Sequence, residues 1–380
     1  MKLIKFDTLY PALYLDKKIK NSLPEIKKMN FREFNSWLIA LRMNFSDFYT
    51  FNLRQHSWDT EEIFLLSNRY YIRKCGFHYY GYFFYFLMFV YKLKNLIFSK
   101  KSILLERLIE KIIKIEKPDV IFIREQSGIN SLFWDKFRDK MLVVSRMECG
   151  VPKYWSPACF DVVYTNIKTY KDFFESNRII TKNNFSGFDR RILDEVNSKN
   201  KIYEVVFIGG LGSPTFTEKT DFFESLLVVS NCNFDFKWWG YKEGSNFDNL
   251  YPELSKRYMG FIGGLEMFEI YAQSKIVIND YGVAAGGQGM NQRIYEVLGV
   301  GTFLLTRASL MFNEWKDSIC TFSDVDDCTS KIQYYLTHEE EREKIAKAGQ
   351  AFVLENFSYF KLIGKLSEEL QEAYKSKFSK

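Results

Sequence analysis

One stretch of the chain combines glycines, an arginine and a glutamate in an order that suits anion binding. It covers residues 280–301 and reads DYGVAAGGQGMNQRIYEVLGVG. We expect a strand to end at Asn279-Asp280, a flexible loop to follow, and a helix to start near Met290. Glycines let a backbone approach a ligand closely, and the free N–H groups at a helix start favour an anion. The loop glycines are Gly282, Gly286, Gly287 and Gly289.

Two charged residues define the chemistry of this stretch further. Arg293 stands in the first turn of the expected helix, where the helix dipole opposes a cation, so a bound anion explains it better than helix stability does. An arginine also holds phosphate by a planar two-pronged contact. Glu296 lies three residues on, on the same helix face, and could accept hydrogen bonds from sugar hydroxyls. The pair suits a nucleotide sugar, with the diphosphate at Arg293 and the ribose at Glu296; a solvated ion pair between them is the alternative.

A second glycine-rich turn, GGLGSP at 209–214, follows a predicted strand and precedes a predicted helix. Gly209 and Gly210 are therefore candidates for phosphate contact. The dinucleotide fingerprint fails, because the third glycine position is Thr215, and no Walker lysine pattern is present. Lys219, expected just ahead of the helix, could reach a phosphate, and a surface lysine is the equal alternative.

In the first half of the chain, charged residues follow two predicted strands. Arg124 and Glu125 come after one strand, and Arg146 and Glu148 come after the next. Buried strand ends seldom carry unpaired charges, so these residues are candidates for a binding or catalytic role, and His56 is a further candidate. Glu148 is the candidate catalytic carboxylate, although Arg146 and Glu148 could simply pair with each other.

The elements that must position these residues alternate between short apolar strands and longer helices, which is typical of parallel sheets with helical crossovers. The predicted strands are 120–123, 141–144, 162–164, 201–208, 234–238, 275–278 and 302–305. The predicted helices are 103–115, 221–229, 267–273, 339–349 and 359–374. A polar stretch at 194–200 suggests a linker, so we expect a domain at 1–195, another at 201–356, and a terminal helical segment at 357–380 that could pack back on the first domain.

Composition narrows the class of protein. At 380 residues the chain is long for one core, and a net charge of +6 without a dense basic block does not predict nucleic-acid binding. The six cysteines form no Cys-x-x-Cys pair and the three histidines stand apart, so no metal site is expected and the thiols should be reduced and mostly buried.

The segment from Phe77 to Tyr91, FHYYGYFFYFLMFVY, is too short for a membrane-spanning helix. Two interpretations stay open: a buried helix, which we favour, or an aromatic face that touches a bilayer surface through residues from Phe77 to Lys101.

The span from about Lys117 to Leu370 resembles the GT-B glycosyltransferases of the CgeB-like (spore-protein) branch, relatives of the retaining nucleotide-sugar transferases. The strongest match is GMNQRIYEVLGVGTFLL at 289–305, followed by HEEEREKIAKAGQAFVLENF at 338–357. The resemblance implies an α/β fold with two facing Rossmann-like domains, parallel sheets and a cleft between them. It also implies a donor site mainly in the C-terminal domain, with Glu296 at the ribose and with Gly263, Gly264, Gly287 and Gly289 near the donor.

The family's glutamate pair, with seven residues between its members, is incomplete here. The position eight before Glu296 is Gln288, whose amide can bond a sugar hydroxyl but carries no charge. This departure puts in doubt the donor sugar and the catalytic importance of the first position. Trp239-Gly240-Tyr241 could flank the nucleotide, although such a pair of tryptophans beside a glycine is more often core.

The sequence therefore predicts a cytoplasmic glycosyltransferase, at the inner membrane face if the aromatic segment touches lipid. It would move a sugar from a nucleoside-diphosphate sugar to a glycan, glycolipid or protein acceptor, as in cell-surface polysaccharide biosynthesis, with a retaining outcome. Arg293, Glu148 and Gln288 are the catalytic candidates, and no cofactor or metal is expected. The alternatives are a sugar-nucleotide epimerase or phosphorylase, a non-catalytic glycan- or lipid-binding assembly protein, and, more remotely, a DNA-modifying enzyme.

Overall fold

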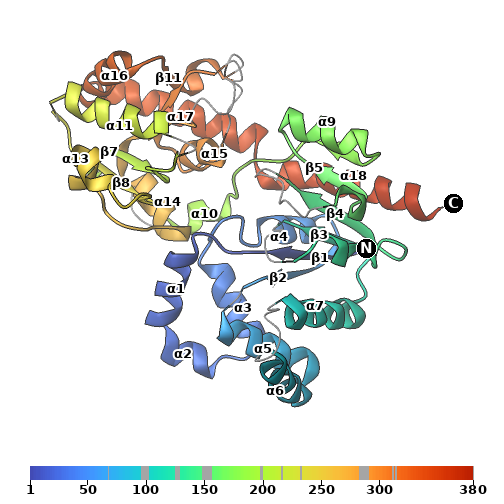
Figure 1. Cartoon of the computed structure of the whole chain (residues 1–380). Coiled ribbons are helices and arrows are strands. Elements are labelled where there is room, and N and C mark those ends of the chain that lie inside the picture. Colours follow the sequence, from blue (N-terminus) through green and yellow to red (C-terminus); the bar gives the residue numbers. More distant parts are fainter. Residues whose placement is uncertain are drawn as a thin grey trace. The chain divides into compact units, whose positions relative to one another are not determined.

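A computed structural model describes most of the chain, as two compact units (Figure 1). Unit 1 comprises residues 1–185 and 363–380, and unit 2 comprises residues 186–362. The domain limits given above stay a prediction, since this division reflects backbone contacts alone. The described residues are 1–66, 68–95, 102–124, 129–147, 156–196, 200–214, 217–231, 233–281, 291–309, 312 and 315–379.

Unit 1 is built on a parallel sheet whose strand order is β2-β1-β3-β4-β5-β6. The strands are β1 (Lys2–Asp7), β2 (Asp59–Phe64), β3 (Val120–Ile123), β4 (Leu142–Arg146), β5 (Val162–Tyr164) and β6 (Ile180–Lys182). The predicted strands 120–123 and 162–164 are confirmed. Neither β1 nor β2 was predicted, because charged residues interrupt their apolar pattern.

Most helices of unit 1 come between β1 and β3 in the sequence. The helices are α1 (Ala12–Asn21), α2 (Leu23–Lys28), α3 (Phe31–Ala40), α4 (Phe48–Gln55), α5 (Arg69–Tyr80), α6 (Phe83–Asn95), α7 (Ser102–Glu116), α8 (Leu132–Asp135) and α9 (Lys168–Ser176). The helix α18 (Tyr359–Phe378) enters unit 1 from Ile363 on, where Trp58 donates a hydrogen bond of 2.7 Å to Ser367 and Lys377 pairs with Asp161 at 2.6 Å.

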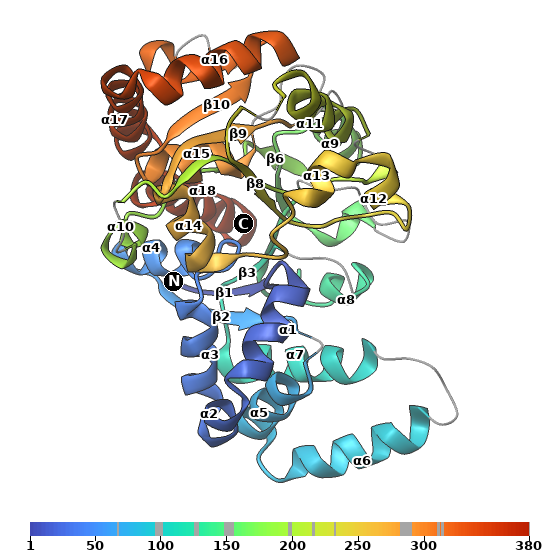
Figure 2. The same ribbon diagram turned by 90° about the vertical axis from the view of Figure 1, so that its left-hand side faces the viewer.

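The aromatic segment after Phe77 is not the buried helix that we favoured. The chain turns at Gly81, where φ is +60°, so the segment is divided between α5 and α6. Figure 2 shows α6 at the side of unit 1 remote from the sheet. Five aromatic side chains here are more than half exposed, because α6 has few neighbours to bury them: Tyr82, Phe83, Tyr85, Phe86 and Phe89.

Unit 2 has a five-stranded parallel sheet in the order β11-β10-β9-β7-β8. The strands are β7 (Tyr203–Ile208), β8 (Phe236–Trp239), β9 (Ser274–Asn279), β10 (Phe303–Arg307) and β11 (Cys320–Phe322). Alternate strand residues face opposite sides, as the pleat requires. One face, with Phe207 and Ile278, packs on apolar residues of α11 (Thr217–Val229) and α16 (Val325–Thr337).

The remaining helices of unit 2 include three that correspond to predicted helices, at 264–272, 292–299 and 339–356, and three short ones that were not predicted. They are α10 (Arg191–Glu195), α12 (Phe247–Leu250), α13 (Pro252–Lys256), α14 (Gly264–Ala272), α15 (Gln292–Gly299) and α17 (Glu339–Asn356). The helices α14 and α15 contact both β9 and each other. Because α11 begins at Thr217, Lys219 lies inside its first turn and not ahead of it.

The cysteines in the described part of the chain, Cys75, Cys159, Cys320 and Cys328, are buried and free. Within the same residues, no helix is long and apolar enough to cross a bilayer.

Candidate functional site

The order in which strands are added to the parallel sheet of unit 2 reverses between β7 and β9. From β7 the chain proceeds outward to β8, and it then returns to the other side of β7 and continues through β9, β10 and β11. In open parallel sheets, ligands bind outside the carboxyl ends of the strands at such a switch point. At this place β7 ends with Ile208 and Gly209, and β9 ends with Asn279.

Arg293, in the first turn of α15, extends across this switch point. Its Nη1 donates a hydrogen bond of 2.6 Å to Asn279 Oδ1, and its guanidinium carbon lies 4.8 Å from the centre of the Phe207 ring. A Cβ atom added to Gly209 would lie 2.5 Å from Arg293 Nη2. The glycine thus leaves the space in which the guanidinium group passes the end of β7, and the predicted pair Arg293 and Gly209 comes together.

Lys219 approaches the same ring from α11, with its Nζ 5.8 Å from the Phe207 ring centre. Burial, together with the positive charge of Arg293, lowers the pKa of Lys219 to about 8. Asp280 and Glu243 oppose this shift. Two cations that share one aromatic ring repel each other, and an anion held between them would remove that repulsion.

Glu296 lies one helical turn after Arg293 and is half-buried. Burial raises the pKa of Glu296 to about 7, and the nearby Arg293 opposes the shift. Tyr271, at the end of α14, is fully buried beside both residues; burial raises the pKa of its hydroxyl, which hydrogen-bonds with Arg293. Glu296 and Arg293 therefore form part of a partly desolvated cluster, and the solvated surface ion pair that we considered does not describe them.

Two residues at the end of β9, Asn279 and Asp280, were not assigned a role from sequence. Asn279 is buried and joins the site together: its Nδ2 donates to Thr306 at 2.9 Å, while its Oδ1 accepts from both Arg293 and Asn291. Asp280 is held by Arg307 through two bonds of 3.0 and 2.8 Å. The sequence offered one signal for these residues, namely that they are polar and stand at the end of an apolar strand. Their partners on β10 and α15 could not be predicted, because they depend on which strands are neighbours in the sheet.

The start of α15 keeps capacity for a ligand. The N-cap residue Asn291 makes no side-chain cap bond, and its Oδ1 is buried without a hydrogen-bond partner among the described residues. Ile294 N–H bonds the Asn291 carbonyl at 3.2 Å, and the first N–H groups of a helix as a class favour an anion.

The other predicted glycines occupy different positions. Gly210 follows Gly209, with 3.5 Å between an added Cβ and Tyr241 Cβ, so space does not demand a glycine there. Gly263 has an extended backbone with φ of −171°, and Gly264, with φ of +61°, begins α14. The helix α14 packs against β7, β9 and α15, and its residue Tyr271 is the one that hydrogen-bonds with Arg293.

Seven of the candidate residues named from sequence lie outside the described residues: Glu125, Glu148, Gly282, Gly286, Gly287, Gln288 and Gly289. Of the segment 239–241, Trp239 is buried beside the fully buried Trp238, so the tryptophan pair belongs to the core, as we considered.

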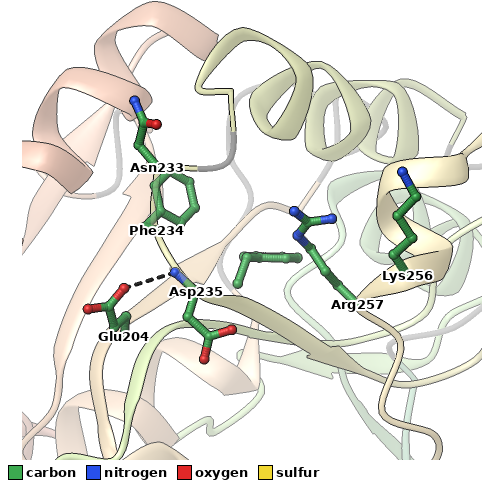
Figure 3. Close-up of a pocket in the computed structure, with 7 residues that line it drawn as sticks. Glu204, Asn233, Phe234, Asp235, Lys256 and Arg257 are labelled. Carbon is green, nitrogen blue, oxygen red and sulfur yellow. Dashed lines mark hydrogen bonds between the residues drawn. The ribbon is translucent and has the colours of Figure 1, made fainter.

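A surface pocket of about 670 Å³ lies elsewhere in unit 2 (Figure 3). It is lined by residues at the starts of β7 and β8, including Glu204 and Asp235, and by Lys256 and Arg257 at the end of α13. This pocket is at the amino ends of the strands, opposite the switch point, and it therefore takes no part in the candidate site.

Two parallel-sheet α/β units of this kind define the GT-B fold, and solved structures bear out the resemblance over the whole chain. Sucrose-phosphate synthase from Thermosynechococcus elongatus is similar with a TM-score of 0.55 and 9% identity, covering 98% of this chain and 100% of that one. HepE of Anabaena, solved with UDP-glucose, has a TM-score of 0.51 and 12% identity at the same coverage. The trehalose-6-phosphate phosphatase N-terminal domain of Candida albicans has a TM-score of 0.54 and 12% identity, covering 98% and 97%.

In sequence, a family model described as glycosyl transferase-like matches residues 215–366, which contain Lys219, Arg293 and Glu296. No curated protein matches the chain. The fold and the family match together support a glycosyltransferase, and neither singles out the CgeB-like branch.

Proposed function

We propose that the chain is a glycosyltransferase that binds a nucleoside-diphosphate sugar at the switch point of unit 2 and transfers its sugar to a glycan, glycolipid or protein acceptor. The observation that carries the proposal is the convergence of Arg293 and Lys219 on Phe207 and Gly209, within the part of the chain that matches the glycosyl transferase-like family. Uridine is the base to test first, because HepE was solved with UDP and with UDP-glucose.

In this proposal the departing diphosphate is stabilised by electrostatics. Arg293, Lys219 and the first N–H groups of α15 are in place before the reaction, and such preorganised donors stabilise developing negative charge. They supply positive charge at the diphosphate without a metal ion, and Glu296 accepts bonds from the ribose hydroxyls. We keep a retaining outcome as part of the proposal, with Gln288 and Glu148 as further candidates.

The first test is a thermal-shift screen of the full chain with UDP, UDP-glucose and other nucleoside diphosphates. A ligand that binds only the folded protein raises its apparent stability. We expect UDP or another nucleoside diphosphate to stabilise the protein, and the addition of an acceptor to release free nucleoside diphosphate. Absence of binding by every nucleotide would contradict the proposal, and isomerised donor without transfer would point to an epimerase.

Lys219 gives a pH prediction for donor binding. Below pH of about 8 its amine is already charged, so binding of UDP needs no proton; above that pH, each binding event must take up a proton. Phosphate groups are fully ionised there, since their second pKa is about 6. Affinity for UDP should therefore fall about tenfold between neutral pH and about two units higher, and calorimetry should detect proton uptake. The Lys219→Gln variant should bind weakly with a flat profile; an unchanged profile in this variant would exclude Lys219.

We further propose that unit 1 touches anionic membrane lipid through the aromatic residues of α5 and α6. Beside these residues lies a pocket of about 590 Å³ to which Lys27, Lys28, Arg73 and Lys74 contribute basic groups and Phe77 and Tyr85 contribute rings. Exposed aromatic side chains beside a basic surface are the composition that interfacial segments use. This contact would bring the enzyme to a lipid-linked acceptor.

Vesicle sedimentation tests this contact. We expect binding to vesicles that contain phosphatidylglycerol, weaker binding to phosphatidylcholine alone, and weakening by salt. Phe86 and Phe89 are 59% and 60% exposed, so Phe86→Ser with Phe89→Ser should lower binding about tenfold or more without unfolding. Phe360, 56% exposed on α18, supplies the matched control Phe360→Ser. Equal loss in both variants, or none in either, would contradict the assignment.

A further inference from the structure

The sheet of unit 1 has the same kind of switch point as that of unit 2. From β1 the chain goes outward to β2, and it then returns to the other side of β1 and continues through β3, β4, β5 and β6. The carboxyl ends of β1 and β3 therefore form the place where a ligand of unit 1 is expected. Asp7 ends β1, Arg124 directly follows β3, and Arg146 ends the neighbouring β4.

Two arginines stack on one ring at this place. The guanidinium carbon of Arg124 lies 3.5 Å from the centre of the Phe45 ring, and that of Arg146 lies 4.3 Å from it. The two guanidinium groups therefore lie beside the same aromatic ring. Stacking uses the faces of a guanidinium group and leaves its in-plane N–H groups to bond with acceptors. In Arg124 one of them, Nη1, already donates to Asp7 at 3.2 Å.

Among the described residues, two of the N–H donors of Arg146 have no acceptor. Arg146 is only 8% exposed, and its Nε and Nη1 atoms are buried with no hydrogen-bond partner among the described residues. A buried charge without a partner is strongly unfavourable, and buried charges in folded proteins are normally paired. Within the described part of the chain, Arg146 is therefore a buried cation with two N–H groups still open to an acceptor.

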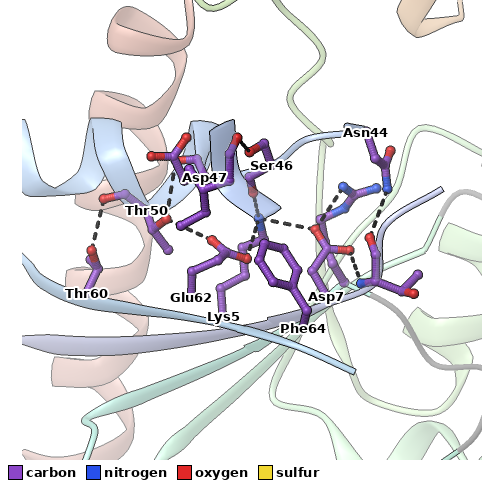
Figure 4. A network of polar contacts seen from close by, with 12 residues as sticks. Lys5, Asp7, Asn44, Ser46, Asp47, Thr50, Thr60, Glu62 and Phe64 are labelled. Atoms are coloured by element: carbon purple, nitrogen blue, oxygen red, sulfur yellow. Dashed lines mark hydrogen bonds and ion pairs between the residues drawn. The ribbon is translucent and has the colours of Figure 1, made fainter. Parts of the chain in front are cut away.

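Of the described carboxylates, Asp7 and Glu62 are already engaged with cations. Asp7 pairs with Lys5 at 3.1 Å and with Arg124 at 3.2 Å, and Lys5 also contacts Glu62 at 3.0 Å and donates to the Ser46 carbonyl at 2.6 Å (Figure 4). Burial, with the negative charge of Asp7, raises the pKa of Glu62 to about 8. Around neutral pH the cluster of Lys5, Asp7, Glu62, Arg124 and Arg146 therefore carries net positive charge.

The loop that holds Phe45 is constrained at the same place. Arg42, Asn44 and Ser46 have positive φ values of 52°, 54° and 38°, which side chains other than glycine rarely adopt. Asn44 donates to the Thr8 carbonyl at 3.4 Å, and Arg42 pairs with Asp47 at 2.9 Å. These bonds fix the loop, so the ring and the two arginines are preorganised without help from a ligand.

We propose that Arg124 and Arg146, stacked on Phe45, form a second anion site that receives a phosphate or carboxylate group of the acceptor. The proposal rests on the proposed function only in assigning the anion to the acceptor; the site itself stands on the geometry of unit 1. An acceptor bound there would be a sugar phosphate, a uronate or a phosphate-bearing lipid precursor, and neutral sugars would bind weakly.

Thermal shift of the full chain tests the site in phosphate-free buffer with saturating UDP, so that the donor site is filled. The probes are inorganic phosphate, glucuronate and glucose, with chloride at equal ionic strength as the control. We expect phosphate, glucuronate or both to stabilise the wild-type protein beyond chloride, and glucose to have no effect. Comparison of phosphate with glucuronate shows whether the site prefers a phosphate or a carboxylate group. If neither anion stabilises the protein, the proposal is overturned.

The variant Arg146→Met separates a ligand role from a structural one. Without ligand its melting temperature should equal or exceed that of the wild type, because the variant removes a buried charge of which two N–H groups have no acceptor among the described residues. It should bind the effective anion about tenfold more weakly or worse while UDP still stabilises it. A marked loss of stability, or unchanged anion binding, would show that Arg146 serves the fold alone.

Arg293→Gln provides the reciprocal control. It should lose stabilisation by UDP and keep the phosphate effect measured without UDP. If no variant or ligand supports sugar transfer but Arg146→Met still abolishes the anion effect, the proposed function fails and the anion site stands. If UDP binding and transfer occur and Arg146→Met changes neither anion binding nor the KM for an anionic acceptor, only the anion site fails.

Discussion

Replacement of Arg293 by alanine should lower kcat/KM about a hundredfold to a thousandfold while leaving the protein folded. The side chain is the cation that crosses the switch point, and loss of one preorganised donor to a developing anion typically costs about 3–4 kcal/mol. Stability should change little, because Asn279 Oδ1 still accepts a bond of 2.9 Å from Asn291. The measurement is release of UDP from UDP-glucose, or from the donor that the binding screen identifies, together with calorimetry of UDP binding.

Two further variants make this result specific. Arg293→Lys keeps the charge but not the planar fork, so it should recover only part of the lost activity. Arg257→Ala removes an arginine from the same unit at the opposite end of the strands, where it pairs with Glu253 at 2.9 Å, and should leave the rate unchanged. A rate for Arg293→Ala equal to that of the wild type would remove this residue from the mechanism.

Gly240→Ala should destabilise unit 2 by about 3 kcal/mol or more and should also weaken donor binding. Gly240 has a φ of +147°, and a Cβ atom there would lie 2.1 Å from the carbonyl oxygen of Gly209. Backbone groups cannot swing away as a flexible side chain can, because Gly209 N–H is bonded to the Trp239 carbonyl at 2.8 Å. An alanine side chain at position 240 would therefore push the ends of β7 and β8 apart and displace Gly209. Donor binding should suffer because the Arg293 side chain passes Gly209.

The matched control for this prediction is Gly260→Ala. Gly260 also has a positive φ, +94°, but nothing lies within 4 Å of an added Cβ, so only the backbone preference is lost. We expect a cost of about 1 kcal/mol and normal UDP binding. Urea unfolding midpoints measure the difference, and equal effects of the two substitutions would show that close approach at Gly209 does not limit stability.

Several elements were predictable because they depend on local pattern. The apolar runs at 120–123 and 162–164 form strands at those residues, and the charged and apolar faces of residues 339–349 are found within α17. Arg293 in a helical first turn after a glycine-containing loop was also identified locally. Local pattern failed at β1, since Lys5 interrupts the apolar run and its charge is accommodated by Asp7 and Glu62.

The aromatic segment after Phe77 failed for the opposite reason. Its composition is that of a buried helix, yet burial requires neighbours, and α6 has few. No property of the residues 77–91 alone could reveal how many elements pack on them. A helix with aromatic side chains all along it was therefore assigned to the core when much of its surface is exposed.

By itself, the sequence determined the alternation of strands and helices, the class of fold, and the residue types suited to a diphosphate at Gly209, Lys219 and Arg293. Only the tertiary structure decided that these three meet, because β9 pairs with β7 after a long excursion through β8, and no local preference encodes which strands become neighbours. The same is true of Arg124 and Arg146, whose common partner Phe45 comes from a distant loop. The local sequence pattern determines which helices and strands form, whereas long-range packing determines which side chains come together in the candidate sites.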